Sequence, residues 1–188
     1  MNIIENAREL FFKMIDDFGK DPRALRWHLT EVERRAKICL QDMSADEEIV
    51  MLWVRLHDVG HYPIQENVDH AVSGEKRAIE FLEAHGYDPE KIKRVAHCVR
   101  AHRCKDVLPE TLEAKIIAFA DSASHMTQND LYIWMAKRSV DEAIAKLERD
   151  YRDLAQFPNL KEKASPLYLA WKNLLQTYEK VMWDIEKK

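Results

Sequence analysis

Apolar residues recur along the chain at intervals of three and four, the spacing of amphipathic helices, and no useful stretch alternates with the period of two that marks a strand. Start and stop signals divide this pattern into separate helices. We expect them at residues 3–18, 22–41, from Ser44 to the turn at 57–60, from near Val68 to Gly86, at 89–103, at 110–126, at 129–156 with an interruption near Ser139, and at 164–186. The pattern therefore predicts one all-α domain over residues 1–188, a bundle of about seven helices.

Several of these boundaries carry a cap that the sequence makes visible. The dipeptides Asp21-Pro22 and Asp88-Pro89 each place an N-cap residue before a Pro at the first helical position. Ser44 with Glu47 has the spacing of a capping box. These signals fix where three of the helices are expected to begin.

Composition narrows the class of protein without indicating a function. Of 188 residues, 46% are hydrophobic and 33% charged, with 4 Gly and 6 Pro, which suits a soluble helical protein better than one with many hairpins. The N-terminal segment is charged within its first five residues, and no apolar run approaches the roughly 18 residues of a membrane span. Three cysteines without CxxC spacing predict reduced thiols. We therefore expect a cytoplasmic protein without a membrane partner.

The last two predicted helices carry aromatic residues at helical spacing. They are Tyr132, Trp134, Tyr151, Trp171, Tyr178 and Trp183. Such a set packs against the N-terminal helices or against a second subunit, and a cofactor box is the less favoured alternative. We expect residues 127–188 to pack on a core at about 21–126, and we expect a homodimer, if one forms, to use these helices.

The segment "LHDVGHYP" at residues 56–63 ends an apolar helix with a His-Asp pair followed by Gly and Pro. A plain polar helix end is one interpretation. Successive helical side chains diverge by about 100°, however, so His57 and Asp58 can serve one site only where the backbone leaves the helix. Gly60 gives the backbone that freedom. The segment then indicates a helix that stops so that both side chains enter one cavity.

Further residues with ligand chemistry fall in the middles or at the ends of other predicted helices. They are His28, His70, His97, His102 and Asp121. Asp121 follows an apolar run, residues 116–120, where a carboxylate is expensive to bury without a counter-charge such as a divalent cation. Imidazole and carboxylate together suit Mn, Fe, Co, Ni or Zn, and a carboxylate can bridge two cations.

The order H…HD…H…H…D, with "HDVG" at its centre and a late helix ending "AKIIAFAD", resembles the HD-domain superfamily of metal-dependent phosphohydrolases. The similarity runs from about His28 to His125, and the segments "HCVRAHR" and "LEAKIIAFADSASH" are similar to those of small stand-alone prokaryotic HD proteins. The resemblance implies an all-α HD-type bundle whose His28, His57, Asp58 and Asp121 bind a first metal ion. It also implies that His70 and His102 bind a second ion, bridged by Asp58. One or two divalent transition metal ions are therefore expected, Mn, Fe, Ni, Co or Zn, with Mg as an alternative.

Two departures from the family pattern leave residue roles open. The family often has Lys where this chain has His61, and that Lys usually meets substrate phosphate. His61 could bind phosphate when protonated, could act as a general acid, or could be a solvated loop residue. His97 and His102 are five positions apart, so on an ideal helix they point about 140° away from each other. We favour His102 as the ligand and His97 as a residue that supports the ligands or is satisfied in the core.

Two more histidines lie near helix ends. His85 precedes Gly86 and is expected to interact with the exposed carbonyl groups of its helix. His125 lies one turn after Asp121 and either orients that carboxylate or lies on the surface.

A local charge feature favours an anionic substrate. Residues 91–105, "KIKRVAHCVRAHRCK", contain Lys and Arg repeatedly and no acidic residue, in a chain whose net charge is −4. A solvated basic face is the alternative interpretation. Arg103 is the best candidate for a phosphate clamp because a guanidinium can bind phosphate oxygens with two parallel hydrogen bonds, although it could instead cover the carbonyl groups at its helix end. The stretch lacks interleaved aromatic residues, so long nucleic acid is not an expected partner.

These observations predict an enzyme, a metal-dependent phosphohydrolase that cleaves a small phosphoester or nucleotide with a metal-activated water molecule. Asp58, His61, His97 and Arg103 are the candidate catalytic residues beside the metal ligands. Two alternatives stay open: an HD-fold di-iron oxygenase with a similar ligand set, and a non-catalytic metal-binding regulatory module.

Overall fold

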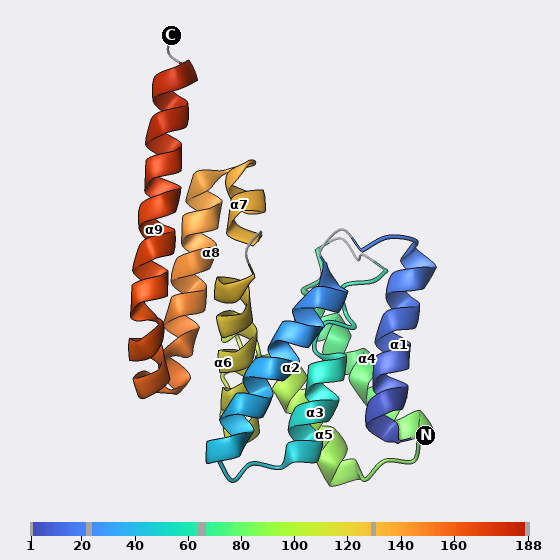
Figure 1. Cartoon of the computed structure of the whole chain (residues 1–188). Coiled ribbons are helices and arrows are strands. Elements are labelled where there is room, and N and C mark those ends of the chain that lie inside the picture. The colour runs from blue at the N-terminus through green and yellow to red at the C-terminus, as the bar shows by residue number, and fades with distance from the viewer. Residues whose placement is uncertain (1, 22–23, 64–66, 129–130, 187–188) are drawn as a thin grey trace. The chain divides into compact units, whose positions relative to one another are not determined.

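The computed structural model describes residues 2–21, 24–63, 67–128 and 131–186 of the chain (Figure 1). Over these residues it contains α-helices and one 3-10 turn, and no strand. The elements are α1 (Ile3–Phe18), α2 (Leu25–Asp42), α3 (Glu47–Leu56), α4 (His70–Ala84), α5 (Pro89–Ala101), α6 (Leu112–Thr127), α7 (Leu131–Ala136), α8 (Val140–Asp153), the 3-10 turn η1 (Leu154–Gln156) and α9 (Pro158–Glu186). The predicted all-α class is confirmed, with nine helices in these segments instead of about seven.

Several helix ends lie where the sequence signals predicted them. Gly19 ends α1 in the left-handed region at φ 80°, which only glycine adopts without strain. The Asp88 side chain accepts hydrogen bonds from the backbone N–H groups of Glu90 and Lys91, with Pro89 at the first turn of α5. Ser139 caps α8 and accounts for the predicted interruption.

The starts of α2 and α3 differ from the prediction. The helix α2 begins at Leu25, although Asp21 still accepts hydrogen bonds from the backbone of Leu25 at 2.8 Å and Arg26 at 3.0 Å. Pro22, predicted as its first residue, lies outside the described residues. The N-cap of α3 is Asp46 and not Ser44, because the Asp46 carboxylate accepts from the N–H of Ile49.

The start of α6 and the extent of α9 also differ. The helix α6 begins at Leu112, two residues later than predicted, where the hydroxyl of Thr111 accepts from the N–H of Ala114 at 3.1 Å. The helix α9 begins at Pro158, six residues before the predicted start. Pro at the first turn of a helix costs no hydrogen bond, which explains this start.

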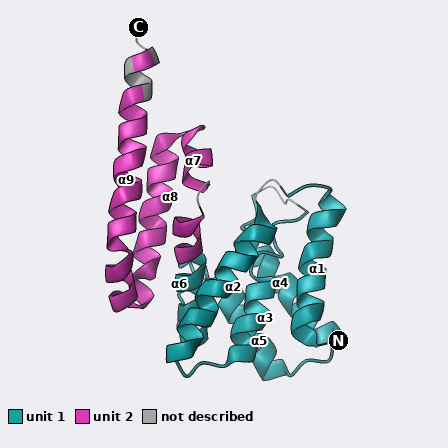
Figure 2. Ribbon diagram, in the orientation of Figure 1, with its two compact units in different colours: residues 1–121 teal, residues 122–188 magenta. Residues whose placement is uncertain are grey.

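Internal contacts divide the chain into two compact units, residues 1–121 and 122–188 (Figure 2). The first unit is built around α3, whose residues Ile49–Leu56 are all buried. The helices α1, α2 and α5 pack on α3, and α4 pairs with α5 (Figure 1). A helix buried on every side needs apolar residues all round, which explains the apolar run Ile49–Val54.

The second unit contains α7, α8 and α9, with α8 packed against both of the others. Tyr132 and Trp171 meet edge to face at 5.2 Å between ring centroids, and the Trp171 indole N–H donates to the carbonyl of Met126 at 2.9 Å. Aromatic packing within this unit therefore accounts for part of the aromatic set. That the C-terminal helices pack on residues 21–126 stays a prediction.

The helix α9 also exposes apolar side chains, among them Leu167, Leu174, Val181 and Ile185. Homodimerisation through this helix stays a prediction. None of the described helices has both the length and the hydropathy needed to cross a bilayer.

Gly60 is required by a close approach and not by an unusual backbone angle. A Cβ atom at this position would lie 1.9 Å from the carbonyl oxygen of His70 and 2.6 Å from the backbone nitrogen of Gly74. Gly60 is also absent from the glycines with positive φ, which are Gly19 and Gly86. The prediction that Gly60 is needed for its conformational freedom is therefore wrong. A glycine is needed here because its missing Cβ lets the turn after α3 lie directly on the first turns of α4.

Gly60→Ala is expected to lower the free energy of unfolding by about 3 kcal/mol or more. This is the upper end of the usual cost of overpacking, and it applies because both groups that the new Cβ would meet are backbone atoms. It should also reduce the metal content of the protein, since α4 carries His70. Chemical denaturation and elemental analysis measure the two effects. Gly86→Ala is the control: its Cβ meets nothing within 4 Å and only its positive φ is strained, so metal content should not change. Equal metal content in the two variants would contradict this account of the turn.

Candidate metal centre

Five helices and one turn of the first unit bring histidine and aspartate side chains together. His28 comes from α2, His57 caps the end of α3, Asp58 follows it in the turn, His70 is the first residue of α4, His102 caps the end of α5, and Asp121 lies in α6. Of these, His28, His57, Asp58, His102 and Asp121 are at most 8% exposed. The structure therefore brings together the six residues that the sequence predicted as metal ligands.

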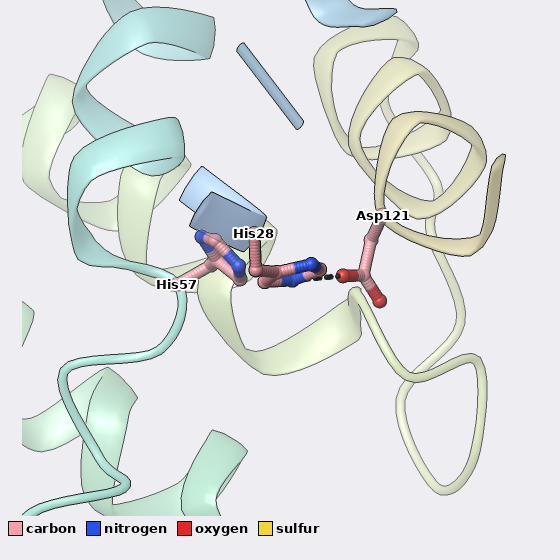
Figure 3. Close-up of side chains that lie close together, drawn as sticks. All are labelled: His28, His57 and Asp121. Carbon is pink, nitrogen blue, oxygen red and sulfur yellow. Dashed lines mark ion pairs between the residues drawn. The ribbon is translucent and has the colours of Figure 1, made fainter. Parts of the chain in front are cut away.

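The first group consists of His28, His57 and Asp121, whose ligand atoms all lie within 4.8 Å of one another (Figure 3). The Nε2 atom of His28 is 3.1 Å from Oδ1 of Asp121, and in Figure 3 these two side chains point toward each other. The Oδ2 atom of Asp58 completes this side, at 3.6 Å from Nε2 of His28 and 3.3 Å from Nε2 of His57.

The second group lies on the other oxygen of Asp58. Its Oδ1 atom is 3.3 Å from Nε2 of His61 and 3.6 Å from Nε2 of His70. The Nε2 atoms of His70 and His102 are 3.3 Å apart. One carboxylate thus faces two clusters of imidazoles, one through each oxygen, which is the arrangement of a bridging ligand.

Two of the imidazoles are held in one tautomer by their own helices. The Nδ1 atom of His57 lies 3.1 Å from the carbonyl oxygen of Val54, and Nδ1 of His102 lies 2.6 Å from that of Val99. A carbonyl can only accept, so each Nδ1 carries the hydrogen and donates it. Each Nε2 is therefore the ring nitrogen that faces the centre, and it offers a lone pair for metal ligation once any proton on it has left.

Burial and the Asp58 carboxylate set the protonation of the imidazoles. Burial lowers the pKa of His102 to about 4 and also lowers that of His70, so both are neutral at neutral pH. Burial disfavours the cation of His57 as well, but the neighbouring carboxylate of Asp58 outweighs it and the pKa of His57 lies above its ordinary value of 6.5. Burial would raise the pKa of Asp58, yet His57 and His61 hold it well below its usual range. In the metal-free protein a proton on His57 thus supplies the positive charge beside Asp58 that a bound cation would otherwise supply.

The residues present fit divalent cations. The Nε2 atom of His57 is completely buried without a hydrogen-bond partner, because its 3.3 Å contact with Asp58 lacks hydrogen-bond geometry. Leaving such an atom unpaired costs about 1–3 kcal/mol, so its position needs an explanation. A cation between the imidazoles and carboxylates supplies one, and mixed nitrogen and oxygen donors favour first-row transition metals.

His97 does not join the centre. It lines a cavity of about 600 Å³ between α4 and α5, and its Nε2 atom accepts a hydrogen bond from the N–H of Glu110 at 3.3 Å. His97 and His102 therefore lie on different faces of α5, as their five-residue spacing predicted, and the structure shows no contact between His97 and the ligands.

The other predicted residues have clear partners. Arg103 forms an ion pair with Asp69, the N-cap residue of α4. His85 caps the end of α4, where its Nδ1 donates to the carbonyl of Phe81 at 2.8 Å, which confirms its predicted role.

His125 belongs to a cluster in the second unit. Its Nδ1 atom lies 2.9 Å from Nζ of Lys146 and 3.3 Å from Oδ1 of the buried Asp150. The hydroxyl group of Tyr132 donates to the other oxygen of Asp150 at 2.7 Å. His125 therefore contacts Lys146 and the buried Asp150 of α8 and is not a plain surface residue, and its predicted role in orienting Asp121 stays a prediction.

The basic stretch 91–105 is largely neutralised by acidic partners. Arg94 binds Asp46 and Glu113, and Arg100 binds Asp106. Lys91 pairs with Glu48 and Lys93 with Glu90. Much of the positive charge in this stretch therefore ties α5 to its surroundings.

Two residues that support the centre carry no signal in the sequence pattern. Arg77, on α4, donates through Nη1 to the carbonyl groups of Val59 (2.7 Å) and Tyr62, and so holds the turn that contains Asp58. Asp69 lies 3.7 Å from Nδ1 of His70 and binds Arg103. Only the position of Asp69 directly before a helix could have suggested its capping role.

These features define a helical protein with a buried His/Asp centre suited to one or two divalent cations. A family model, described as HD domain, matches residues 27–126, which is more than half of the chain. The chain belongs to the HD-domain family, and the predicted resemblance is confirmed. Neither a curated protein nor a solved structure matches the chain.

Asp58→Ala should abolish metal retention, with an affinity loss of more than about a hundred-fold, because it removes the carboxylate shared by both groups. Elemental analysis after reconstitution and dialysis measures this. His85→Ala, which removes a histidine far from the centre in the fold, is the matched control and should retain metal as the wild type does. If His85→Ala lost as much metal as Asp58→Ala, the centre described above would not be the metal site.

Metal affinity is expected to fall as the pH drops through the raised pKa of His57, because a cation must displace that proton. His70 and His102, whose pKa values are lowered, are already neutral there and release none. Calorimetric titration with Mn²⁺ near pH 6, in buffers of different ionisation enthalpy, should detect release of about one proton per chain. Release of no proton at that pH would contradict a protonated His57 in the metal-free protein.

Proposed function

We propose that the protein is a metal-dependent phosphohydrolase that cleaves a small phosphoester or nucleotide. The observation that carries this proposal is the position of Asp58, whose two oxygens face two separate imidazole groups 3.3–3.6 Å away. A carboxylate placed in this way suits a pair of cations, and cation pairs are a common solution for displacement at phosphorus.

The ligand residues would hold the cations in a fixed geometry. His28, His57, Asp58 and Asp121 would hold one ion, and His70 and His102 would hold the other together with Asp58. A bound divalent cation supplies Lewis acidity, which lowers the pKa of a coordinated water molecule toward neutrality and polarises a phosphoryl oxygen. His57 and His102, locked by their carbonyl contacts, present their Nε2 atoms without reorganisation, and such preorganisation reduces the cost of reaching the transition state.

The charge balance of the centre also favours an anionic substrate. Its two carboxylates, Asp58 and Asp121, are buried, and the imidazoles of His70 and His102 are neutral. Two divalent cations would therefore leave the centre with excess positive charge in a site of low dielectric constant, where attraction to a phosphate group is strong.

We further propose that Arg103 binds the substrate phosphate. Arg103 is 38% exposed at its side chain and lies beside His102 in the chain. Its Nη1 is committed to Asp69, but Lys105 lies 3.6 Å from the same carboxylate and can keep it paired when Arg103 turns to a substrate. A guanidinium has five donor hydrogens, so binding Asp69 does not exhaust its capacity.

The experiment that tests the function is a panel of phosphomonoesters, phosphodiesters and nucleotides, dinucleoside polyphosphates included. The protein is assayed after reconstitution with Mn, Fe, Co, Ni, Zn or Mg, and Asp58→Ala is the inactive control. Metal-dependent release of phosphate or nucleotide supports the proposal. Oxygen uptake by the iron-loaded protein without hydrolysis would instead indicate a di-iron oxygenase, and metal binding without either reaction would indicate a regulatory module.

Arg103→Ala should lower kcat/KM by about ten- to a hundred-fold, the equivalent of a charged hydrogen bond of about 1.5–3 kcal/mol, with metal content unchanged. Arg103→Lys should recover only part of this loss, because an ammonium group cannot bind two phosphate oxygens in parallel.

Asp69→Asn is the matched control for the ion pair, since it removes the carboxylate charge, leaves the guanidinium in place and keeps an oxygen that can cap α4. Its metal content is measured alongside, because Asp69 also lies 3.7 Å from His70. If Arg103 serves only to pair with Asp69, both substitutions should lower Tm to a similar extent and leave kcat/KM as in the wild type. That result would remove Arg103 from the substrate site.

A further inference from the structure

The side chain of His61 is largely buried and lies against the carboxylate of Asp58 and the ring of His70. Its side chain is 14% exposed, and its Nε2 atom points at Oδ1 of Asp58 from 3.3 Å. Its ring stacks on that of His70, with centroids 4.0 Å apart and an angle of 16° between the planes. Of the three roles left open by the sequence, the solvated loop residue is therefore excluded.

We propose that His61 is a ligand of the second cation, together with Asp58, His70 and His102. This inference concerns the same centre as the proposed function and rests on its metal dependence, but it requires no particular substrate. It gives His61 a role that a Lys could not fill, because a Lys ammonium group repels a cation.

The distances between donor atoms support this assignment. Ligand atoms at about 2 Å from a tetrahedral ion lie about 3.4 Å from one another. The Oδ1 atom of Asp58 is 3.3 Å from Nε2 of His61 and 3.6 Å from Nε2 of His70, which in turn is 3.3 Å from Nε2 of His102. Asp58, His61 and His70 also form one group with all ligand atoms within 4.8 Å. The ligand atoms of Asp58, His61 and His70 are thus spaced as those of one ion are, and His102 meets this group through its contact with His70.

The backbone holds His61 in this position. The N–H of His61 donates to the carbonyl of Asp58 at 3.0 Å, which closes the turn. The hydroxyl of Ser73 donates to the carbonyl of Gly60 at 3.1 Å, and Arg77 holds Val59 and Tyr62. Ser73 and Arg77 belong to α4, the helix that begins with His70. One helix thus fixes both histidines, and such support preorganises a ligand pair.

This assignment changes the expected metal preference of the second site. With His61 included, the site has three imidazoles and one carboxylate, a donor set that favours Mn, Fe, Co, Ni or Zn over Mg. Mg²⁺ prefers oxygen ligands and retains its own waters, so it should occupy this site poorly.

The test compares wild type with His61→Ala and His61→Phe. The Phe variant keeps an aromatic ring to stack on His70 but has no ligand atom, so it separates ligation from packing. His85→Ala is the control histidine. Each protein is reconstituted with Mn²⁺, dialysed and examined by elemental analysis and by electron paramagnetic resonance, which distinguishes a bridged manganese pair from a single ion. Thermal melting verifies that each variant is folded.

The wild type and His85→Ala should hold about two Mn²⁺ ions per chain and give the signal of an exchange-coupled pair. Both His61 variants should fall to about one ion with the six-line signal of isolated Mn²⁺. Mg²⁺ should not displace the second ion of the wild type when both are present in equal amounts.

Retention of two coupled ions by both His61 variants would overturn the proposal. If those variants bound inorganic phosphate more weakly by calorimetry, His61 would be a phosphate contact. A wild type that never exceeds one ion would also overturn it. The proposed hydrolytic function is judged separately, because metal stoichiometry is independent of substrate: a protein that holds two ions through His61 and hydrolyses nothing would refute the function and leave this assignment intact.

Discussion

The buried carboxylate of Asp58 is the constraint on which the first unit depends. Moving a carboxylate out of water costs several kcal/mol unless opposite charge and hydrogen-bond donors surround it. Here four imidazoles approach it, from His28, His57, His61 and His70, and two of them, His57 and His61, hold its pKa well below the usual range against the effect of burial. Those histidines come from three helices and one turn, so satisfying a single carboxylate requires the helices to meet at one place. The fold and the metal site therefore have a common energetic cause.

Contacts with other helices hold both ends of the buried helix α3 in place, and so position Asp58. At its start, the backbone N–H of Asp46 donates to Glu113 at 3.1 Å, and Arg94 bridges the two carboxylates of Asp46 and Glu113. At its end, Gly60 lies against α4 so closely that no Cβ fits, and Arg77 donates to the turn. A helix anchored in this way delivers His57 and Asp58 with little freedom, and a metal site needs such a positioned ligand set.

The sequence predicted the features that depend on local spacing and failed where tertiary contacts decide. The helices follow from apolar periodicity and caps, and the order and helical context of the six candidate ligands indicated which side chains would meet. The five-residue spacing of His97 and His102 correctly predicted that they lie on different faces of α5, because this separation depends only on helix geometry. The reason for Gly60 and the role of Arg77 could not be predicted, since both depend on how α4 approaches a turn far from it in sequence. The same holds for the basic stretch, because Asp46, Glu48 and Asp106 reach it only after folding.

The ion pairs of the basic stretch 91–105 show where unbalanced positive charge remains. Arg94 and Arg100 are matched by two carboxylates each, Asp46 and Glu113 for the first, Glu75 and Asp106 for the second. Arg103 and Lys105, by contrast, share the one carboxylate of Asp69, which lies 3.7 Å from the ring of His70. Positive charge is thus in excess at the edge of the second imidazole group and balanced elsewhere along α5. Since attraction between charges falls with distance and with solvent screening, an anion drawn to α5 is drawn to that edge, beside the group formed by Asp58, His61 and His70.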